Sequence, residues 1–434
     1  MGNAADALEK KLASRDATVA VVGQGYVGLP LAMELVEAGF RVVGIDVDDE
    51  RVGQLNRGDS YIFDISDAQL SAAVDSGRFT ATTDYARVSE ADAISICVPT
   101  PLRKTRDPDV SYIQAAARSM APHLASPVLI VLESTTYPGT TEEVVVPMLL
   151  EGGRELDEDV FVAFSPERVD PGNARFGLKN TPKVVGGVTP DSTRLIETLY
   201  SQVVEHVHPV TSAREAELVK LLENTFRAVN IALVNEMAIM CDRMDIDIWN
   251  VIEAAATKPF GFMPFYPGPG IGGHCIPLDP TYLAWKAKSY GYYNRFIELA
   301  TDINGNMPRF VAQKLSRELN RRGVAMRDAR ILILGVAYKP NINDLRESPA
   351  LDSWTLLESE FDADVTYHDP YIDRLEMFDA ESVKLSMETL AETDAVLIVT
   401  NHADVDYDLV VEHGAFVLDA RNAIHAATDN VVRL

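Results

Sequence analysis

The chain has 434 residues, of which 47% are hydrophobic, so it is long enough for two or three domains with cores of their own. It carries 65 acidic against 39 basic residues, a formal net charge of −26, and a surface of this sign repels nucleic acid and anionic lipid. No apolar run reaches the roughly 18 residues of a membrane span, and residues 1–16 lack a signal-type apolar core. We therefore expect a cytoplasmic protein that binds neither nucleic acid nor membrane.

The basic residues and the cysteines give two further expectations. Arg outnumbers Lys about two to one, and an acidic, lysine-poor surface fits a salt-rich cytosol, where screening relieves self-repulsion. The alternative is an acidic protein that needs no salt. The three cysteines, Cys97, Cys241 and Cys275, lack paired spacing, so we expect no disulfide framework and no metal site. An important thiol would act singly.

The N-terminal part predicts a dinucleotide site. A β-branched run over residues 18–22 leads into Gly23-Gln24-Gly25-Tyr26-Val27-Gly28 and then a helical pattern over residues 29–38. The glycines allow a tight turn, and the N-terminus of the helix faces a pyrophosphate. A second strand ends in Asp46, which can bind both ribose hydroxyls, so NAD is favoured over NADP unless Arg51 compensates a 2′-phosphate. The alternative is a glycine turn beside a solvent-exposed Asp.

Further strands are predicted at residues 93–98, 128–132 and 161–164, with a helix over residues 110–124. Thr100 follows the first strand, Thr135 the second, and the charged turn with Glu167 and Arg168 the third. Ligands bind at this carboxyl edge of open α/β sheets, so Thr100 and Thr135 are candidates to line a cofactor and substrate cleft. Each could equally be a helix cap. The first domain is expected to close near residue 210.

Residues 213–242 contain neither Pro nor Gly and predict one helix of roughly 45 Å, long enough to bridge two domains. Its apolar face exceeds what one neighbour would cover, so a homodimer contact is expected. Lys220 and Asn224 are four residues apart and share a face. Such polar residues are usually solvated, but beside a reactive thiol they become active-site donors.

The thiol of Cys275 lies in a stretch, residues 267–280, that is too rich in Gly and Pro to predict helix or strand. Its glycines, Gly270 and Gly272 among them, let the backbone approach a ligand closely, and Asp279 could reach the same cavity. The alternative is a buried small hydrophobe in a connector. Helices predicted at residues 248–256 and 282–291 make a small helical middle domain.

A charged helix over residues 307–322 leads to a linker at Gly323 and a second α/β unit. Its first strand, residues 329–334, is followed by a loop with Lys339 and Arg346 and by a helix capped by Ser348. Strands recur at residues 365–368, 395–399 and 415–418. This unit lacks the glycine motif, and Lys339 and Arg346 suit a nucleotide diphosphate, although ordinary surface charge is the alternative.

Seven stretches between residues 18 and 422 carry a resemblance to a known family. In order, they are Gly23 to Gly28, Val98-Pro99-Thr100-Pro101, Glu133-Ser134-Thr135 with Pro138-Gly139-Thr140-Thr141, Ser165-Pro166-Glu167-Arg168, Glu217-Leu218-Val219-Lys220 through Asn224, the Cys275 stretch, and Lys339-Pro340 with Asp344-Leu345-Arg346-Glu347-Ser348-Pro349. Together they resemble the UDP-glucose/GDP-mannose dehydrogenase family, NAD-dependent enzymes that oxidise a sugar nucleotide twice at C6. Within the thiol stretch, Phe260-Gly261-Phe262-Met263-Pro264-Phe265-Tyr266 and Gly273-His274-Cys275-Ile276-Pro277 are most similar to the branch acting on UDP-N-acetylglucosamine. The branches acting on UDP-N-acetylmannosamine and UDP-glucose are the alternatives.

The resemblance implies an α/β fold in which two Rossmann-like doubly wound domains are joined by a long helix and a small helical dimerisation domain. The implied divisions are an NAD-binding domain over residues 1–210, a central domain over residues 211–322 and a UDP-sugar-binding domain over residues 323–434. By this resemblance, the residues that contact the cofactor are Gly23, Gly25, Tyr26, Val27, Gly28, Asp46, Arg51, Thr100 and Thr135. Arg421 is a further residue near the cofactor. Sugar-nucleotide contacts fall to Glu167, Arg168, Lys220, Asn224, Tyr266, Gly270, Gly272, Lys339 and Arg346.

The resemblance also implies a mechanism. A water held by Asp279 with Lys220 removes the hydroxyl proton during the first oxidation. The thiolate of Cys275 attacks the aldehyde, and a second hydride loss yields a thioester that water hydrolyses with help from Glu167. Lys220 and Asn224 stabilise the oxyanions. The rivals are a one-step 3-hydroxyacid dehydrogenase, which needs no thiol, and a nucleotide-sugar sensor that is not an enzyme.

Overall fold

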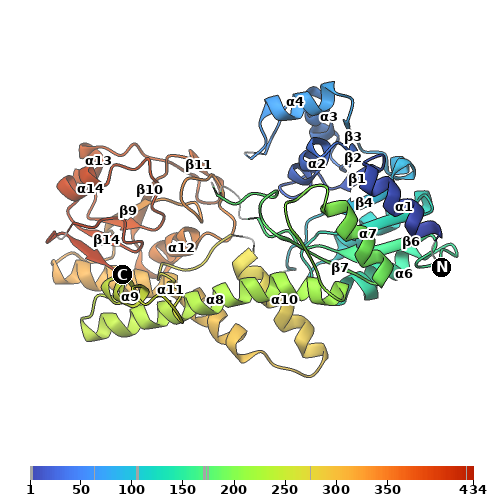
Figure 1. Cartoon of the computed structure of the whole chain (residues 1–434). Helices are drawn as coiled ribbons and strands as arrows, with labels where there is room; N and C mark the ends of the chain where they lie inside the picture. The colour runs from blue at the N-terminus through green and yellow to red at the C-terminus, as the bar shows by residue number, and fades with distance from the viewer. Residues whose placement is uncertain are drawn as a thin grey trace. The chain divides into compact units, whose positions relative to one another are not determined.

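The computed structural model describes residues 3–62, 64–103, 107–169, 173, 175–273, 275–426 and 428–434. The chain divides into two compact units, Met1–Glu223 with Trp285–Gly291 and Asn224–Ala284 with Tyr292–Leu434. Helices α8 (Ala213–Met244) and α10 (Cys275–Ser289) each contribute residues to both units. Each unit has its own sheet with helices on both faces (Figure 1).

The sheet of the first unit has eight strands in the order β3-β2-β1-β4-β5-β6-β7-β8. Strands β1 to β6 are parallel to one another, whereas β7 is antiparallel to β6 and parallel to β8, so the last two strands run in the opposite direction. The reversal of strand order beside β1 is that of a doubly wound dinucleotide-binding fold. The strands are β1 (Thr18–Val22), β2 (Arg41–Ile45), β3 (Phe79–Thr82), β4 (Ala93–Ile96), β5 (Val128–Leu132), β6 (Val160–Phe164), β7 (Lys183–Gly187) and β8 (Val207–Pro209). The helices are α1 (Asn3–Ser14), α2 (Gly28–Glu37), α3 (Asp49–Arg57), α4 (Asp67–Asp75), η1 (Tyr85–Glu90), α5 (Ser111–Met120), η2 (Ala121–His123), η3 (Thr141–Val145), α6 (Val146–Leu149) and α7 (Pro190–Tyr200).

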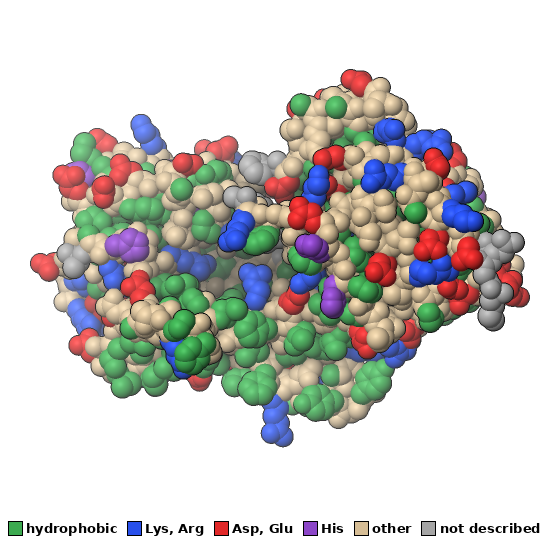
Figure 2. All heavy atoms as spheres, viewed as in Figure 1, with side chains coloured by type: hydrophobic (Ala, Val, Ile, Leu, Met, Phe, Trp, Pro, Cys, Tyr) green, Lys and Arg blue, Asp and Glu red, His purple; other side chains and the backbone are tan. Residues whose placement is uncertain are grey.

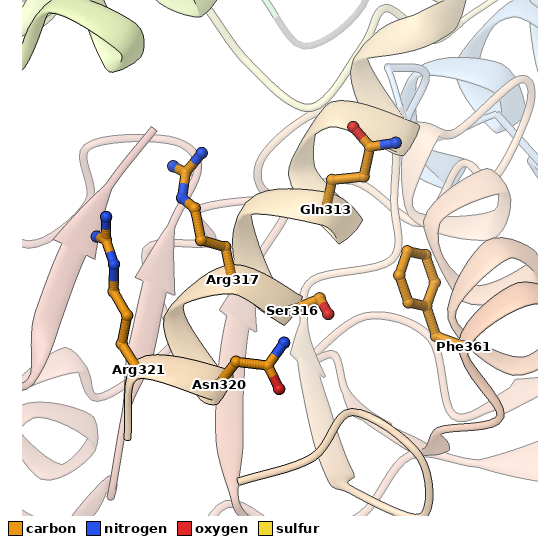
Figure 3. Close-up of a pocket in the computed structure, with 6 residues that line it drawn as sticks. All are labelled: Gln313, Ser316, Arg317, Asn320, Arg321 and Phe361. Carbon is orange, nitrogen blue, oxygen red and sulfur yellow. The ribbon is translucent and has the colours of Figure 1, made fainter. Parts of the chain in front are cut away.

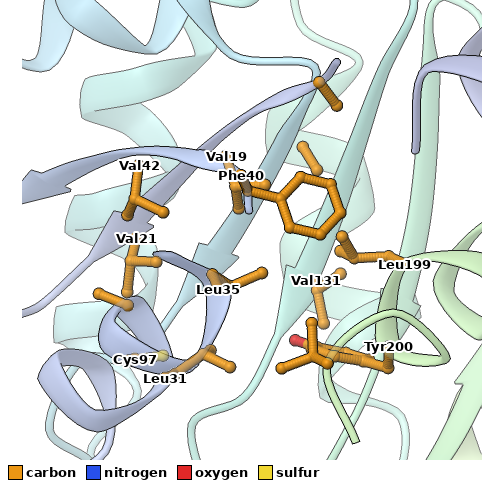
Figure 4. Close-up of a cluster of buried hydrophobic side chains, with 14 of the residues drawn as sticks. Val19, Val21, Leu31, Leu35, Phe40, Val42, Cys97, Val131, Leu199 and Tyr200 are labelled. Atoms are coloured by element: carbon orange, nitrogen blue, oxygen red, sulfur yellow. The ribbon is translucent and has the colours of Figure 1, made fainter. Parts of the chain in front are cut away.

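The central strands of this sheet are buried along their whole length, because helices cover both faces. On one face, Val19 and Val21 of β1 pack with Leu31 and Leu35 of α2 and with Phe40 (Figure 4). This is why the strands read as continuous β-branched runs rather than as alternating patterns. The predicted strands at residues 18–22 and 128–132 are confirmed.

The sheet of the second unit has five parallel strands in the order β10-β9-β13-β14-β15. The α/β class predicted from the sequence is confirmed, whereas the divisions at residues 210 and 322 stay predictions. The elements of this unit other than α8 and α10 are α9 (Ile248–Ala256), α11 (Arg295–Arg321), β9 (Arg330–Leu334), α12 (Pro349–Phe361), β10 (Asp364–His368), β11 (Arg374–Leu375), η4 (Glu376–Phe378), β12 (Ala380–Glu381), α13 (Met387–Ala391), β13 (Ala395–Ile398), α14 (Tyr407–His413), β14 (Val417–Asp419) and β15 (Val431–Arg433).

Two predictions about helices were wrong. Cys275 is not in a loop but is the first residue of α10. The helix tolerates Pro277 because this residue lies in the first turn, where a backbone N–H has no partner within the helix. Helix α11 begins at Arg295 rather than at residue 307, with Pro308 inside it. Buried residues at helical spacing sustain α11 across that proline.

Within the described part of the chain, no helix combines the length and apolar character that a membrane span requires. The cytoplasmic location stays a prediction.

Candidate active site

The glycine turn of the first unit gives each of its three glycines a different role. Gly23 has φ of +90°, and a Cβ there would lie 2.5 Å from the carbonyl oxygen of Cys97. A Cβ on Gly28 would collide with the Gly23 carbonyl, so this glycine lets α2 pack against the turn. A Cβ on Gly25 would meet nothing within 4 Å. The turn therefore leaves open space at the position where a pyrophosphate approaches the start of α2, and these residues fit a dinucleotide.

Asp46 ends β2 beside this turn and is buried. Its Oδ2 accepts a hydrogen bond from the backbone N–H of Gln24 at 2.8 Å, and its Oδ1 accepts one from that of Asp48 at 3.1 Å. Arg51, on α3, forms a 3.4 Å ion pair with Asp48 and lies over the ring of Tyr61. The carboxylate is therefore held in place at the end of β2. Tyr26 of the turn is exposed, and Val27 occupies the N-cap position of α2.

Thr100 and Thr135 follow β4 and β5, as predicted, and neither caps a helix. Thr100 is buried. Thr135 Oγ1 lies 2.6 Å from Nζ of Lys220, which donates a hydrogen bond to it from helix α8. The structure therefore brings together two predicted site residues that are 85 positions apart in the chain.

Glu167 and Arg168 follow β6 and make separate contacts. Oε1 of Glu167 accepts hydrogen bonds from the backbone N–H groups of Arg168 and Val169, each at 2.7 Å. The guanidinium of Arg168 pairs with Glu223 of α8, with one nitrogen 2.6 Å from Oε1. Arg168 thus ties the turn after β6 to α8 and leaves the carboxylate of Glu167 held by the backbone.

A buried ion pair that was not predicted from the sequence lies at the same sheet edge. Nζ of Lys183, the first residue of β7, lies 2.9 Å from Oε2 of Glu133 and 3.8 Å from Oε2 of Glu167. Tyr200 donates a further hydrogen bond to Glu133. Glu133 could have been predicted as a site residue, because it is a charged residue directly after a buried strand. The residues around Lys183 in the sequence give no sign that Lys183 pairs with Glu133.

In the second unit, Asn224 and Asp279 are joined by a hydrogen bond. Nδ2 of Asn224, on α8, donates to Oδ2 of Asp279 at 2.6 Å, and both side chains are buried. Asp279 lies one turn beyond Cys275 on α10, and the Cys275 side chain is partly exposed. The first turn of a helix presents backbone N–H groups that favour negative charge on a thiolate.

The last two glycines before Cys275 leave room for neighbouring parts of the protein, and their predicted role beside a ligand stays a prediction. A Cβ on Gly272 would lie 2.7 Å from the carbonyl oxygen of Glu347, and one on Gly273 would lie 2.7 Å from the ring of Tyr338. The Gly273 N–H donates to the carbonyl oxygen of Arg346 at 2.9 Å. The stretch before the thiol is therefore packed against the loop between β9 and α12, the loop that carries Lys339.

Three other predicted residues of this unit are also placed. Arg346 forms a bidentate ion pair with Asp344, with Nη2 2.6 Å from Oδ2. Tyr266 stacks on Trp249 with ring centroids 6.0 Å apart. Arg421 lies beside Gly268 and donates from Nε to the carbonyl oxygen of Val399 at 2.8 Å; burial lowers its pKa to about 10. The predicted position Gly270 has φ of +140°, whereas His274 lies outside the described residues.

Comparison with known proteins identifies the family. Residues 17–204 match the NAD binding domain of the UDP-glucose/GDP-mannose dehydrogenase family, residues 214–306 its central domain, and residues 332–426 its UDP binding domain. The chain belongs to this family. As a family member it is an NAD-dependent oxidoreductase acting on a UDP-sugar, so the interpretation as a sensor without enzymatic activity is set aside.

Several relatives in the UDP-glucose/GDP-mannose dehydrogenase family cover most of the chain. A UDP-N-acetyl-D-glucosamine 6-dehydrogenase of Pseudomonas aeruginosa is 37% identical over 82% of this chain and 84% of its own. A UDP-N-acetyl-D-mannosamine dehydrogenase of Pyrococcus horikoshii is 36% identical over 94% of this chain and 96% of its own. A solved structure of UDP-D-ManNAc dehydrogenase from Pyrococcus horikoshii has a TM-score of 0.87 at 33% identity, covering 96% of this chain and 98% of that one.

A hollow of about 520 Å³ in the second unit involves none of the predicted site residues. Figure 3 shows its lining side chains along α11, opposite Phe361. Arg317 and Arg321 of this hollow already pair with Asp242 and Glu318. We assign this hollow no part in the chemistry of the family.

Proposed function

We propose that this dehydrogenase oxidises the C6 hydroxyl of UDP-N-acetylglucosamine twice, to the uronate, through a covalent bond to Cys275. The observation that carries the proposal is the thiol at the start of α10, with Asp279 one turn further on and hydrogen-bonded to Asn224. A one-step alcohol oxidation needs no thiol. A second oxidation, of an aldehyde, needs a nucleophile that converts the carbonyl into a new hydride donor.

In the first oxidation the C6 hydroxyl loses its proton to a base. Asp279 is buried, and we assign to its carboxylate the water that takes this proton. Bound NAD⁺ supplies a hydride acceptor for each of the two oxidations. Lys220 and Asn224 follow one another by one turn of α8 and offer an ammonium and an amide to the developing alkoxide.

In the second oxidation the thiolate of Cys275 bonds to the aldehyde carbon and gives a thiohemiacetal. Loss of a hydride from that carbon leaves a thioester. Water then attacks the thioester, Glu167 receives one proton from the water, and the carbon–sulfur bond breaks to release the thiolate and the carboxylic acid. The acid loses its remaining proton to solvent and leaves as the carboxylate. Cationic Lys339 and Arg346 supply charge for the diphosphate of the sugar nucleotide.

The identity of the UDP-sugar rests on similarity to named relatives. The thiol stretch is most similar to the N-acetylglucosamine branch, and the Pseudomonas aeruginosa relative carries that activity in its name. UDP-N-acetylmannosamine is the second candidate, favoured by the coverage of the Pyrococcus horikoshii relative and its solved structure. UDP-glucose is the third.

The test is to incubate the purified protein with NAD⁺ and each of these three UDP-sugars in turn, counting NADH per sugar consumed. We expect two NADH per UDP-N-acetylglucosamine and the highest kcat/KM with that sugar. A higher value with UDP-N-acetylmannosamine would replace the substrate but keep the reaction. One NADH per sugar, with an aldehyde product, would contradict covalent catalysis.

We also propose a homodimer formed through α8. Figure 2 shows hydrophobic side chains gathered along the lower face in that view. Phe226, Leu233, Met240 and Met244 of α8 are each more than 40% exposed, at spacings of seven, seven and four. Their spacing keeps them on one side of the helix, while Ala228, Ala232 and Asn235 bury another side. An exposed apolar stripe of this kind is typical of a subunit interface.

A further inference from the structure

Lys183 stands out because it is a buried ammonium that none of the steps above uses. Its side chain is 5% exposed, that of Glu133 is fully buried, and that of Glu167 is 13% exposed. The ammonium lies between the two carboxylates, closer to Glu133. A buried charge destabilises the fold unless it is paired. Lys183 therefore either forms a purely structural ion pair with Glu133 or also orients the carboxylate of Glu167.

The register of the sheet fixes where Lys183 stands relative to Glu167. Strands β6 and β7 are antiparallel, with Ala163 opposite Gly187 and Phe164 opposite Gly186. Continuing this register past the end of β6 brings Lys183 opposite Glu167. Oγ of Ser165 donates to the carbonyl oxygen of Val184 at 2.9 Å, which holds the two segments together beyond the last ladder pair. Backbone pairing therefore sets the distance between the ammonium and the carboxylate.

The two oxygens of Glu167 have different partners. Oε1 accepts the two backbone hydrogen bonds from Arg168 and Val169, and Oε2 faces Nζ of Lys183 at 3.8 Å. Two hydrogen bonds from backbone N–H groups to one oxygen restrict the rotation of a carboxylate. Glu167 is thus held in one orientation, with a positive charge beside one of its oxygens.

Glu133 makes this arrangement possible by keeping Lys183 charged. Burial by itself would lower the pKa of Lys183, but the carboxylates of Glu133 and Glu167 outweigh burial and raise that pKa. Tyr200 donates to the second oxygen of Glu133, so that carboxylate is partnered on both sides. The two carboxylates, at 2.9 and 3.8 Å from Nζ, therefore favour the ammonium form of Lys183.

We propose that Lys183 is a positioning residue that holds Glu167 as an oriented carboxylate for hydrolysis of the thioester on Cys275. The inference rests on the proposed function and extends it to a residue that touches neither substrate nor cofactor. In this step the water oxygen bonds to the thioester carbon, and Glu167 accepts a proton from that water. The carbon–sulfur bond breaks, the electron pair returns to the thiolate, and no electrons leave the carbon.

The test uses two variants. Lys183→Met removes the charge and keeps an unbranched side chain one atom shorter, and the double variant combines Lys183→Met with Glu133→Gln. We expect the single variant to melt at a lower temperature because it leaves Glu133 buried without its cation. The double variant removes both charges and recovers most of that melting temperature. In both variants turnover falls about 100-fold, the size of a general-base contribution, with KM nearly unchanged.

The diagnostic readout is the intact-protein mass after mixing with UDP-sugar and NAD⁺. Slow hydrolysis makes a covalent uronyl adduct accumulate on Cys275 in both variants, after a rapid burst of NADH. The control is Lys179→Met, which removes an exposed lysine paired with Glu37 at 3.2 Å and should show wild-type turnover and no adduct.

The outcomes separate the two proposals. If the double variant regains turnover together with its melting temperature and shows no adduct, Lys183 is structural and the inference is overturned. If the wild-type protein forms two NADH per sugar while neither variant accumulates adduct, only the positioning role fails. If the wild-type protein forms no NADH with any UDP-sugar, the proposed function itself fails.

Discussion

Cys275 differs from the other two cysteines in its surroundings. Cys97 and Cys241 are buried among apolar side chains, Cys97 in the cluster of Figure 4, and burial raises the pKa of the Cys97 thiol well above its ordinary value. A thiol of that kind stays protonated and is a poor nucleophile. Cys275 is partly exposed and begins a helix.

This contrast predicts the effect of removing each thiol. Cys275→Ala should abolish formation of the carboxylate, because no thiohemiacetal can form, whereas Cys97→Ala and Cys241→Ala should keep turnover within about threefold of wild type. Product analysis by mass spectrometry after incubation with NAD⁺ and UDP-sugar provides the measurement. Normal carboxylate from the Cys275 variant would refute covalent catalysis.

At the scale of elements, the loop between β9 and α12 is fastened by one buried carboxylate. Oδ2 of Asp369 accepts hydrogen bonds from the N–H groups of Val336 and Ala337, at 2.8 and 3.2 Å. It also lies 3.0 Å from Nε2 of His402. Nδ1 of His402 accepts from the Asn341 N–H at 2.9 Å, so Nε2 carries the proton and donates to Asp369. The second unit thus uses this carboxylate to hold its own loop.

These contacts predict a pH-dependent stability. Burial by itself would raise the pKa of Asp369, but hydrogen bonds from His402, Val336 and Tyr371 lower it overall. The folded protein therefore gains stability from Asp369 above the unfolded pKa of about 3.9 and loses it as pH falls through the lower folded value. We expect Asp369→Asn to cost about 1–3 kcal/mol at pH 7, and the gap to wild type to narrow progressively as pH falls below about 5.

Melting temperatures of the two proteins across that pH range give the measurement, with Asp373→Asn, a change at an exposed carboxylate, as the control. A gap that stays constant down to pH 3 would show that the charge of Asp369 does not hold the loop.

At the scale of the whole molecule, the proposed dimer makes a direct prediction. Leu233→Lys places a charge in the exposed apolar stripe of α8 and should convert a dimer into a monomer, since a lysine buried in an interface loses its hydration. Glu236→Gln changes the charge of the same helix by the same amount at an exposed polar position and should leave the dimer intact. Sedimentation velocity gives the masses, and a wild-type monomer would contradict the proposal.

The net charge of −26 predicts a response to salt. The Debye length falls from about 10 Å at 0.1 M salt to about 3 Å at 1 M, so KCl relieves repulsion between carboxylates across the surface. We expect both melting temperature and activity to rise by 2 M KCl, and equimolar sucrose, which is excluded from the surface without screening charge, to do less. Full stability and activity in dilute buffer would argue against a salt-adapted surface.

The sequence by itself determined the features that rest on contiguous residues. The glycine turn from Gly23 to Gly28, the acidic residue at the end of β2, the uninterrupted helix α8 and the capped start of α12 were all predicted, because local spacing and turn chemistry encode them. The thiol stretch was found in the same way. Residues 267–273 lie outside helix and strand, as predicted, but the helix that begins at Cys275 was missed, because Pro277 in a first helical turn does not prevent a helix.

The tertiary structure alone decided which distant side chains meet. Lys183 and Glu133 are 50 positions apart, and they pair because β7 turns antiparallel and brings its first residue to the edge where β5 and β6 end. Asn224 and Asp279 meet through two helices that are separated along the chain. No local pattern records a strand direction or a helix crossing, since both depend on how the whole core packs. The order of motifs in the sequence therefore indicated the family. The packing of the core decided which charged and polar side chains pair with one another at the candidate active site.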